Sequence, residues 1–100
     1  MSAYIIADVL VNDPVEYENY KRQTPASIAR YGGRFVVRGG RAESLEGDWQ
    51  PNRIVVLEFP SLEQAKKWWA CEEYAPVKAI RLRTASSRLI VVEGVDSVTS

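Results

Sequence analysis

The stretch AYIIADVLVNDPVEY, which spans Ala3 to Tyr17, passes from an apolar run straight into the start signals of a helix. Residues 3–11 are mostly apolar, contain several β-branched side chains and are short for a buried helix, so they predict a β-strand. Asp13 is a favoured helix N-cap, Pro14 suits the first helical position, and Glu16 follows at the spacing of a capping box. The stretch therefore predicts a strand that leads through a short turn into a helix.

The same order recurs in RIVVLEFPSLEQAKKW, residues 53–68. Residues 53–59 predict another strand, and Pro60 ends it. Ser61 and Gln64 then repeat the capping signal before a second helix. The chain therefore contains two strand-to-helix units.

The first helix carries an apolar stripe with an interruption. Residues at three- and four-residue spacing predict one core-facing side: Tyr17, Tyr20, Thr24, Ile28 and Tyr31. Pro25 lies inside the stripe and removes a backbone donor, so we expect a kink or two short helices here. Gly32 provides a natural stop.

Between the two units, GGRFVVRGG at residues 32–40 predicts an edge strand bracketed by glycine pairs. Strict alternation places Phe35, Val37 and Gly39 on one face and Arg34, Val36, Arg38 and Gly40 on the other. The polar, turn-rich residues 41–53 predict a strand extension followed by an exposed loop.

After the second helix, residues 71–85 predict a break and a short helix with Pro76 in its first turn, and residues 87–93 predict a last strand. The order β-α-β-β-α-β is the ferredoxin-like pattern of an α+β sandwich with an antiparallel four-stranded sheet. We expect one such domain over residues 1–95 and a flexible C-terminal tail at 96–100.

Composition excludes several classes of function. The formal net charge is zero, so no global field favours nucleic acid or an anionic membrane. There is no histidine and a single cysteine, Cys71, which argues against haem, transition metals, imidazole catalysis and an internal disulfide. No apolar run approaches the length of a membrane span, and the start carries no basic leader. We therefore expect a cytoplasmic protein with no cofactor and no metal.

The predicted strands are apolar in both alternation phases, which is typical of a sheet that is covered on both faces. The helices supply one cover only. We therefore expect a homodimer packed sheet face to sheet face, with the second copy as the other cover.

Several ordered blocks carry a family resemblance: residues 4–20, 31–40, 45–49, 53–68 and 73–81. Together they resemble the bacterial domain of unknown function 1330 family in the dimeric α/β-barrel superfamily. The resemblance implies a ferredoxin-like protomer and a dimer whose two sheets form a barrel. It implies no particular reaction, although other branches of the superfamily include cofactor-free monooxygenases, haem-degrading enzymes and isomerases.

Asp8 and Arg38 are the candidate catalytic residues. Asp8 interrupts an apolar strand, and its carboxylate needs a partner, for which Arg38 is a natural counter-charge. In one interpretation Arg38 binds a carboxylate or enolate oxygen, and Asp8 holds Arg38 or moves a proton. In the other, the two form a structural ion pair that fixes strand register or the dimer.

The candidate ligand-binding residues are Arg38, Gly39, Gly40, Trp49, Arg53, Tyr74 and Arg81. The two glycines are expected to bend the strand and clear space beside Arg38. Trp49 lies in a loop and could cap a pocket or pack on a partner. Tyr74 and Arg81 share one helical face if the short helix includes both.

The leading hypothesis is a small homodimer that binds a small anionic or oxygenated organic molecule between sheet and helices, with cofactor-free enzymatic chemistry as its extension. The alternative is a non-catalytic dimeric binding or interaction module whose charged residues are structural.

Overall fold

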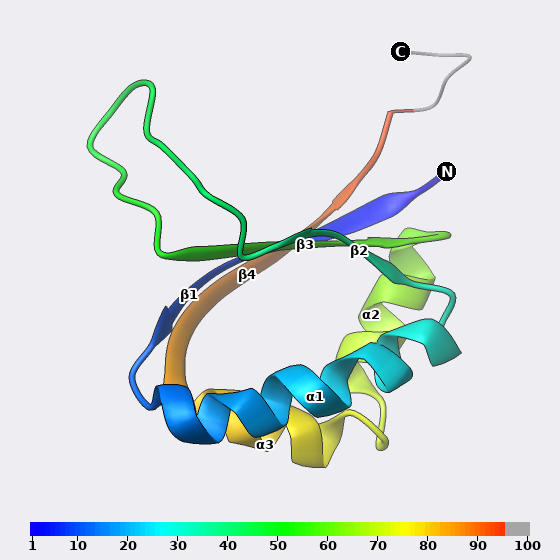
Figure 1. Cartoon of the computed structure of the whole chain (residues 1–100). Coiled ribbons are helices and arrows are strands. Elements are labelled where there is room, and N and C mark those ends of the chain that lie inside the picture. The colour runs from blue at the N-terminus through cyan, green and yellow to red at the C-terminus, as the bar shows by residue number, and fades with distance from the viewer. Residues whose placement is uncertain (96–100) are drawn as a thin grey trace.

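Four strands form one antiparallel sheet in the order β2-β3-β1-β4. They are β1 (Ala3–Val11), β2 (Arg34–Arg38), β3 (Arg53–Phe59) and β4 (Ala85–Glu93). The computed structural model describes residues 1–95, and the tail predicted at 96–100 lies outside them. Within residues 1–95, all the helices lie on one face of the sheet, and no helix covers the other face (Figure 1). This is the ferredoxin-like α+β fold that the sequence predicts.

The helices are α1 (Pro14–Arg30), α2 (Leu62–Ala70) and α3 (Ala75–Thr84). Both predicted N-caps are confirmed. The Glu16 amide donates to Asp13 Oδ1 at 3.2 Å, and the Gln64 amide donates to Ser61 Oγ at 3.1 Å. Each cap satisfies a backbone donor that the first turn of a helix leaves free.

Helix α1 runs continuously through Pro25, so two separate helices do not form here. A proline at this position leaves the carbonyl of Lys21 without its helical donor. That carbonyl instead accepts a hydrogen bond of 2.6 Å from Nη2 of Arg38. Arg38 of β2 thus supplies the hydrogen-bond donor that Pro25 lacks. The same bond holds the Arg38 side chain against α1.

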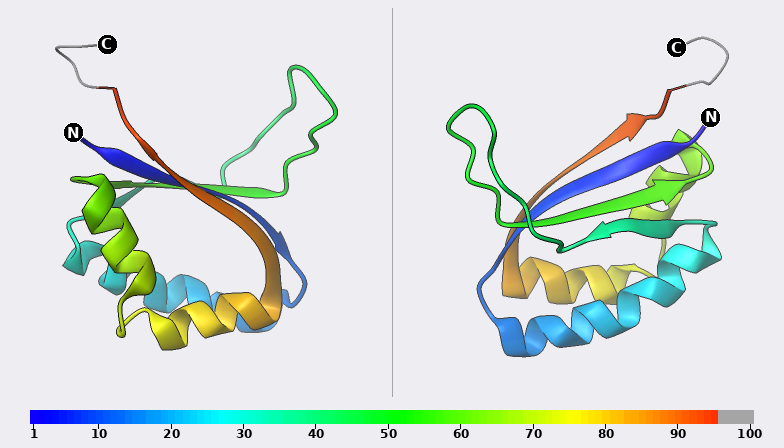
Figure 2. Two further views of the ribbon diagram at one scale, coloured as in Figure 1. Left: turned by 180° about the vertical axis from the view of Figure 1, so that it is seen from behind. Right: turned by 45° about the horizontal axis from the view of Figure 1, so that its top comes forward.

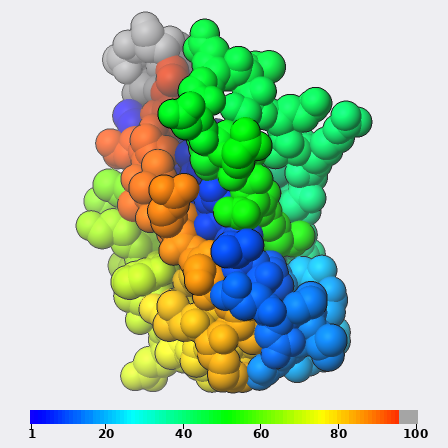
Figure 3. All heavy atoms as spheres, turned by 90° about the vertical axis from the view of Figure 1, so that its left-hand side faces the viewer, coloured from blue at the N-terminus to red at the C-terminus, as the bar shows by residue number. Residues whose placement is uncertain are grey.

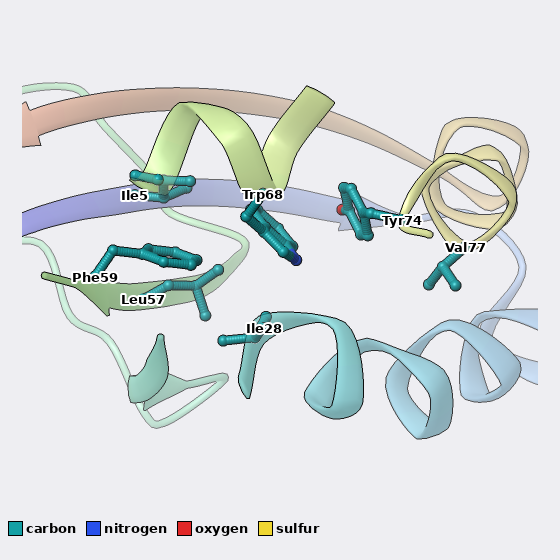
Figure 4. Packing of buried hydrophobic residues seen from close by; sticks show 8 residues of the cluster. Ile5, Ile28, Leu57, Phe59, Trp68, Tyr74 and Val77 are labelled. Carbon is teal, nitrogen blue, oxygen red and sulfur yellow. The ribbon is translucent and has the colours of Figure 1, made fainter. Parts of the chain in front are cut away.

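The core lies between the sheet and the helices (Figure 4). Trp68 of α2 is its largest fully buried side chain. Its ring centroid lies 4.1 Å from that of Tyr74 and 5.6 Å from that of Phe59, and its indole N–H donates to Ser27 Oγ at 3.0 Å. The indole therefore ties α1 and α2 to β3 and to the start of α3.

A β-bulge in β2 makes the predicted alternation of this strand wrong beyond Val36. Phe35 pairs with Leu57 and Val37 pairs with Val56, so Val36 is the extra residue. A bulge re-aims the side chains that follow it. Arg38 pairs with Val55 and therefore faces the helices, on the same side as Phe35.

Residues 39–52 form an exposed loop, and the predicted strand extension is absent from it. The loop projects from the sheet on the side away from the helices (Figure 2). In the space-filling view it lies, in green, at the opposite end of the molecule from α1 and α3 (Figure 3). Strand β4 begins at Ala85 directly after α3, slightly earlier than predicted.

Candidate functional site

A small cavity lies between the sheet and the helices α1 and α3. We call it the inner cavity; its volume is about 30 Å³. Strand residues such as Val55 and Leu57 line one side, and Tyr17 and Tyr20 of α1 line the other. It adjoins an open recess of about 490 Å³, the mouth, and the two share Lys21, Arg38 and Arg53. The remaining cations are Arg81 in the inner cavity and Arg22 at the mouth.

At the inner cavity and its mouth, positively charged side chains outnumber the carboxylates that could pair with them. Of the nine arginines, five have a carboxylate within salt-bridge distance in residues 1–95: Arg30, Arg34, Arg41, Arg83 and Arg88. Arg22, Arg38, Arg53 and Arg81 have no such partner within the described chain, and all of them line the inner cavity or its mouth. The one carboxylate at the mouth, Glu18, is paired with Lys21 at 2.9 Å.

Arg81 is the most deeply placed of these cations, with 5% of its surface exposed. Its Nη1 donates to Ser87 Oγ at 3.0 Å, while its Nε is buried and has no hydrogen-bond partner in the described structure. The Nε of Arg53 is buried without a partner in the same way. Buried donors of this kind are rare in native proteins and point to a missing partner.

Gly39 makes room for Arg53. It has a φ of +70°, a conformation that L side chains rarely adopt, and a Cβ at this position would collide with the Arg53 guanidinium. Its amide donates to the carbonyl of Ile54 at 2.8 Å, which closes the sheet at this corner. The glycine therefore clears space for Arg53 and not for Arg38. Gly40 has open space around it, and nothing in the structure explains its identity.

Tyr17 and Tyr20 are the phenols that line the inner cavity, and Tyr74 contacts Tyr20. The hydroxyls of Tyr20 and Tyr74 lie 2.7 Å apart. Burial, reinforced by Tyr74, raises the pKa of Tyr20 far above its usual value, and burial also raises the pKa of Tyr17. Burial disfavours the charge of Arg81, but attraction to Tyr74 and Tyr20, which acts once these phenols ionise at high pH, outweighs burial and raises the pKa of the guanidinium. Near neutral pH the cavity therefore contains neutral hydroxyl groups and charged guanidinium groups.

Arg38 lies at the mouth, exposed, with its guanidinium carbon 4.3 Å from the centre of the Phe35 ring. The bond to Lys21 and this ring fix its position, so little side-chain entropy remains to be lost when a ligand binds.

Asp8 lies on the opposite, open face of the sheet, so the predicted pair with Arg38 does not form within one chain. Its carboxylate accepts from Trp49 Nε1 at 2.9 Å and from the Asn52 amide at 3.0 Å, and Arg88 lies 3.6 Å away. The bond from Trp49 holds the pKa of Asp8 below its usual value, and the bond from Asn52 acts in the same direction. Asp8 therefore anchors the exposed loop to the sheet.

The structure divides the predicted site residues into two groups. Arg38, Arg53 and Arg81 line the inner cavity, while Gly39 lies against Arg53 and Tyr74 contacts Tyr20. Asp8 and Trp49 lie together on the open face.

Sequence reasoning missed Tyr17, Tyr20, Lys21 and Arg22 as site residues. Helical spacing predicts only a core-facing position for the two tyrosines, and it does place them on the correct face. Pro25 was the available signal for Lys21, because it frees a carbonyl that needs an external donor.

No group of three or more metal-ligating side chains occurs within residues 1–95. In the same part of the chain, no helix combines the length and the apolar character that crossing a membrane requires.

The fold recurs in solved structures, whereas no curated protein matches the chain. A protein of unknown function from Rhodopseudomonas palustris is 20% identical with a TM-score of 0.75, over 95% of this chain and 83% of that one. SnoaB, a cofactor-independent oxygenase from Streptomyces nogalater, is 16% identical with a TM-score of 0.64, over 99% and 98% of the two chains. A dimeric protein of unknown function with a ferredoxin-like fold from Bacteroides fragilis is 14% identical with a TM-score of 0.56, over 93% and 96%. At these identities the likeness establishes the fold alone.

The sequence itself is matched over residues 2–95 by a family model, described as a domain of unknown function, DUF1330. This agrees with the resemblance of the sequence blocks, and the chain belongs to the DUF1330 family.

Proposed function

We propose that this protein binds a small anionic or oxygenated organic molecule in the inner cavity and its mouth. The observation that carries the proposal is the convergence on one place of Arg22, Arg38, Arg53 and Arg81, all without a carboxylate partner in residues 1–95, in a chain whose formal net charge is zero. Transferring an unpaired guanidinium from water into a low-dielectric site costs several kcal/mol of free energy. A bound anion would offset that free energy and would satisfy the free Nε donors.

The same groups support cofactor-free chemistry as an extension of binding. Charged guanidinium groups and neutral phenols, fixed in a water-poor cavity, stabilise negative charge that develops on oxygen, as in an enolate. SnoaB, which shares the fold, is a cofactor-independent oxygenase. We propose oxyanion stabilisation as the contribution of Arg53, Arg81 and Tyr20 to such a reaction.

Replacing Arg38 by Ala tests the proposal at a residue whose loss leaves the core intact. We expect anion affinity to fall by about tenfold or more, because a hydrogen bond between charged groups contributes about 1.5–3 kcal/mol. The assay is isothermal titration of the purified protein with succinate. Arg34→Ala is the matched control, since Arg34 belongs to the same strand but pairs with Glu58 on the open face.

The alternative function, a module whose charges only specify the dimer, predicts a different result. Arg38→Ala would then leave anion binding unaffected or absent. Equal anion affinity in the wild type, Arg38→Ala and Arg34→Ala would refute the proposed role of this residue.

We also propose that the protein is a homodimer through the open face of its sheet. Ile6 lies between Val56 and Ile90 in neighbouring strands, so an aliphatic row crosses this face. Ile90 and Val92 are 61% and 43% exposed in the single chain. A second copy related by a two-fold axis would bury this face against itself. The neighbour from Bacteroides fragilis is described as dimeric, which supports a dimer but not a particular interface.

Ile90→Lys is expected to separate the subunits. Two-fold symmetry buries two copies of Ile90, each contributing about 1.5–3 kcal/mol, so the dimer dissociation constant should rise at least about a hundredfold. Leu82→Lys on α3 is the control, because Leu82 is similarly exposed, at 65%, but lies in the helical layer. Light scattering at micromolar concentration should give a dimer for the wild type and Leu82→Lys, and a monomer for Ile90→Lys. A monomeric wild type would refute the dimer.

A further inference from the structure

We infer that the ligand carries two anionic groups, one held by Arg53 and Arg81 in the inner cavity and the other by Arg22 and Arg38 at the mouth. A small aliphatic dicarboxylate is the chemical class. This inference rests on the proposed function, because it specifies the molecule that the same site takes.

The unpaired cations lie at different depths. Arg81 borders the inner cavity alone, Arg22 borders the mouth alone, and Arg38 and Arg53 border both. Arg81 is almost fully buried, whereas Arg22 and Arg38 are exposed. The positive charges therefore follow a path from the surface to the interior and do not surround a single point.

The sizes of the two spaces limit what each can contain. The inner cavity, at about 30 Å³, has room for one or two water molecules. A carboxylate group can take the place of two waters and accept hydrogen bonds from the free Nε donors of Arg53 and Arg81. The mouth, at about 490 Å³, accommodates the rest of the molecule.

The excess of positive charge favours a ligand with more than one negative group. Glu18 is already paired with Lys21, so it does not neutralise the arginines. Arg22 contacts the side-chain oxygen of Asn19, which is uncharged, and Arg38 contacts a backbone carbonyl. A single carboxylate at Arg53 and Arg81 would leave the mouth positive, and a second carboxylate would pair with Arg22 and Arg38.

The wall between these positions is apolar. Phe35 and Val55 line the cavity next to the mouth. A short methylene chain suits this wall, because it places no polar group of the ligand where the protein offers no hydrogen-bond partner. These requirements select a dicarboxylate with a short aliphatic spacer over a compact dianion such as sulfate.

The test compares anions on the full chain by titration calorimetry at constant ionic strength, using acetate, succinate, glutarate and sulfate. We expect a dicarboxylate to bind about tenfold or more tightly than acetate, which corresponds to one additional charge-assisted contact. Arg22→Ala should reduce dicarboxylate affinity to about that of acetate and leave acetate binding unchanged, because Arg22 reaches only the mouth. Arg41→Ala, at an exposed loop arginine paired with Glu43, is the control and should change neither.

Each of the other possible results would refute one particular claim. Equal affinity for acetate and both dicarboxylates would refute the two-group ligand and leave the anion site in place. Tightest binding by sulfate, with no effect of Arg22→Ala, would likewise refute the dicarboxylate and indicate a compact dianion. Absence of binding by all four anions would refute the proposed function itself.

Discussion

Replacing Trp68 by Ala is expected to lower the free energy of unfolding by about 3–5 kcal/mol, the range for removing a buried aromatic side chain. Trp68 is 1% exposed, packs on Tyr74 and Phe59, and gives its indole N–H to Ser27. Its removal would create a cavity where α1, α2 and β3 meet. Because small domains are stable by only about 5–15 kcal/mol in total, the variant should be close to unfolding at room temperature.

The adjacent tryptophan provides the control. Trp69 is 47% exposed, and its ring contacts the Lys78 ammonium, 3.8 Å from the ring centre. Such an exposed cation–π contact contributes about 0.5–1 kcal/mol, so Trp69→Ala should unfold close to the wild type. Urea denaturation of the three proteins at one concentration measures the difference. Similar losses for both variants would contradict the packing described for α2.

The secondary structure could be predicted from the sequence because its signals are local. Asp13 and Ser61 cap their helices within one turn, and Pro60 ends a strand next to it. The order of these elements, β-α-β-β-α-β, then predicted the ferredoxin-like arrangement.

The site could be predicted only in part because its assembly depends on contacts far apart in the sequence. Helical spacing correctly placed Tyr74 and Arg81 on one buried face. The bulge at Val36 depends on how β2 pairs with β3, and this register reverses the face of Arg38. Pro25 indicates locally that the carbonyl of Lys21 needs another donor, but that Arg38 of β2 supplies it is a long-range contact that no local pattern reveals.

Arg81→Met is expected to abolish anion binding without lowering the free energy of unfolding. Methionine replaces the unbranched aliphatic part of the arginine side chain and carries no charge, so the substitution removes an unpaired buried cation. The variant loses the hydrogen bond to Ser87, which contributes about 1 kcal/mol, whereas relief of the buried charge is expected to be at least as large. The free protein should therefore keep its stability or gain some, and anion binding should be lost.

A structural role for Arg81 gives the opposite expectation. If the guanidinium served mainly to hold α3 on β4 through Ser87, removing it would destabilise the free protein. Arg83→Met is the matched control on the same helix, since Arg83 is exposed and paired with Glu16. That variant should lose no more than about 1 kcal/mol and should retain anion binding.

The most direct measurement is the melting temperature of the wild type, Arg81→Met and Arg83→Met, each in an anion-poor buffer and again with succinate. Succinate should raise the melting temperatures of the wild type and Arg83→Met, since saturation at about a hundred times the dissociation constant adds about 2.7 kcal/mol. Arg81→Met should melt at or above the wild-type temperature without succinate and should not respond to it. An Arg81→Met protein that melts well below the wild type and still responds to succinate would contradict an anion site at Arg81.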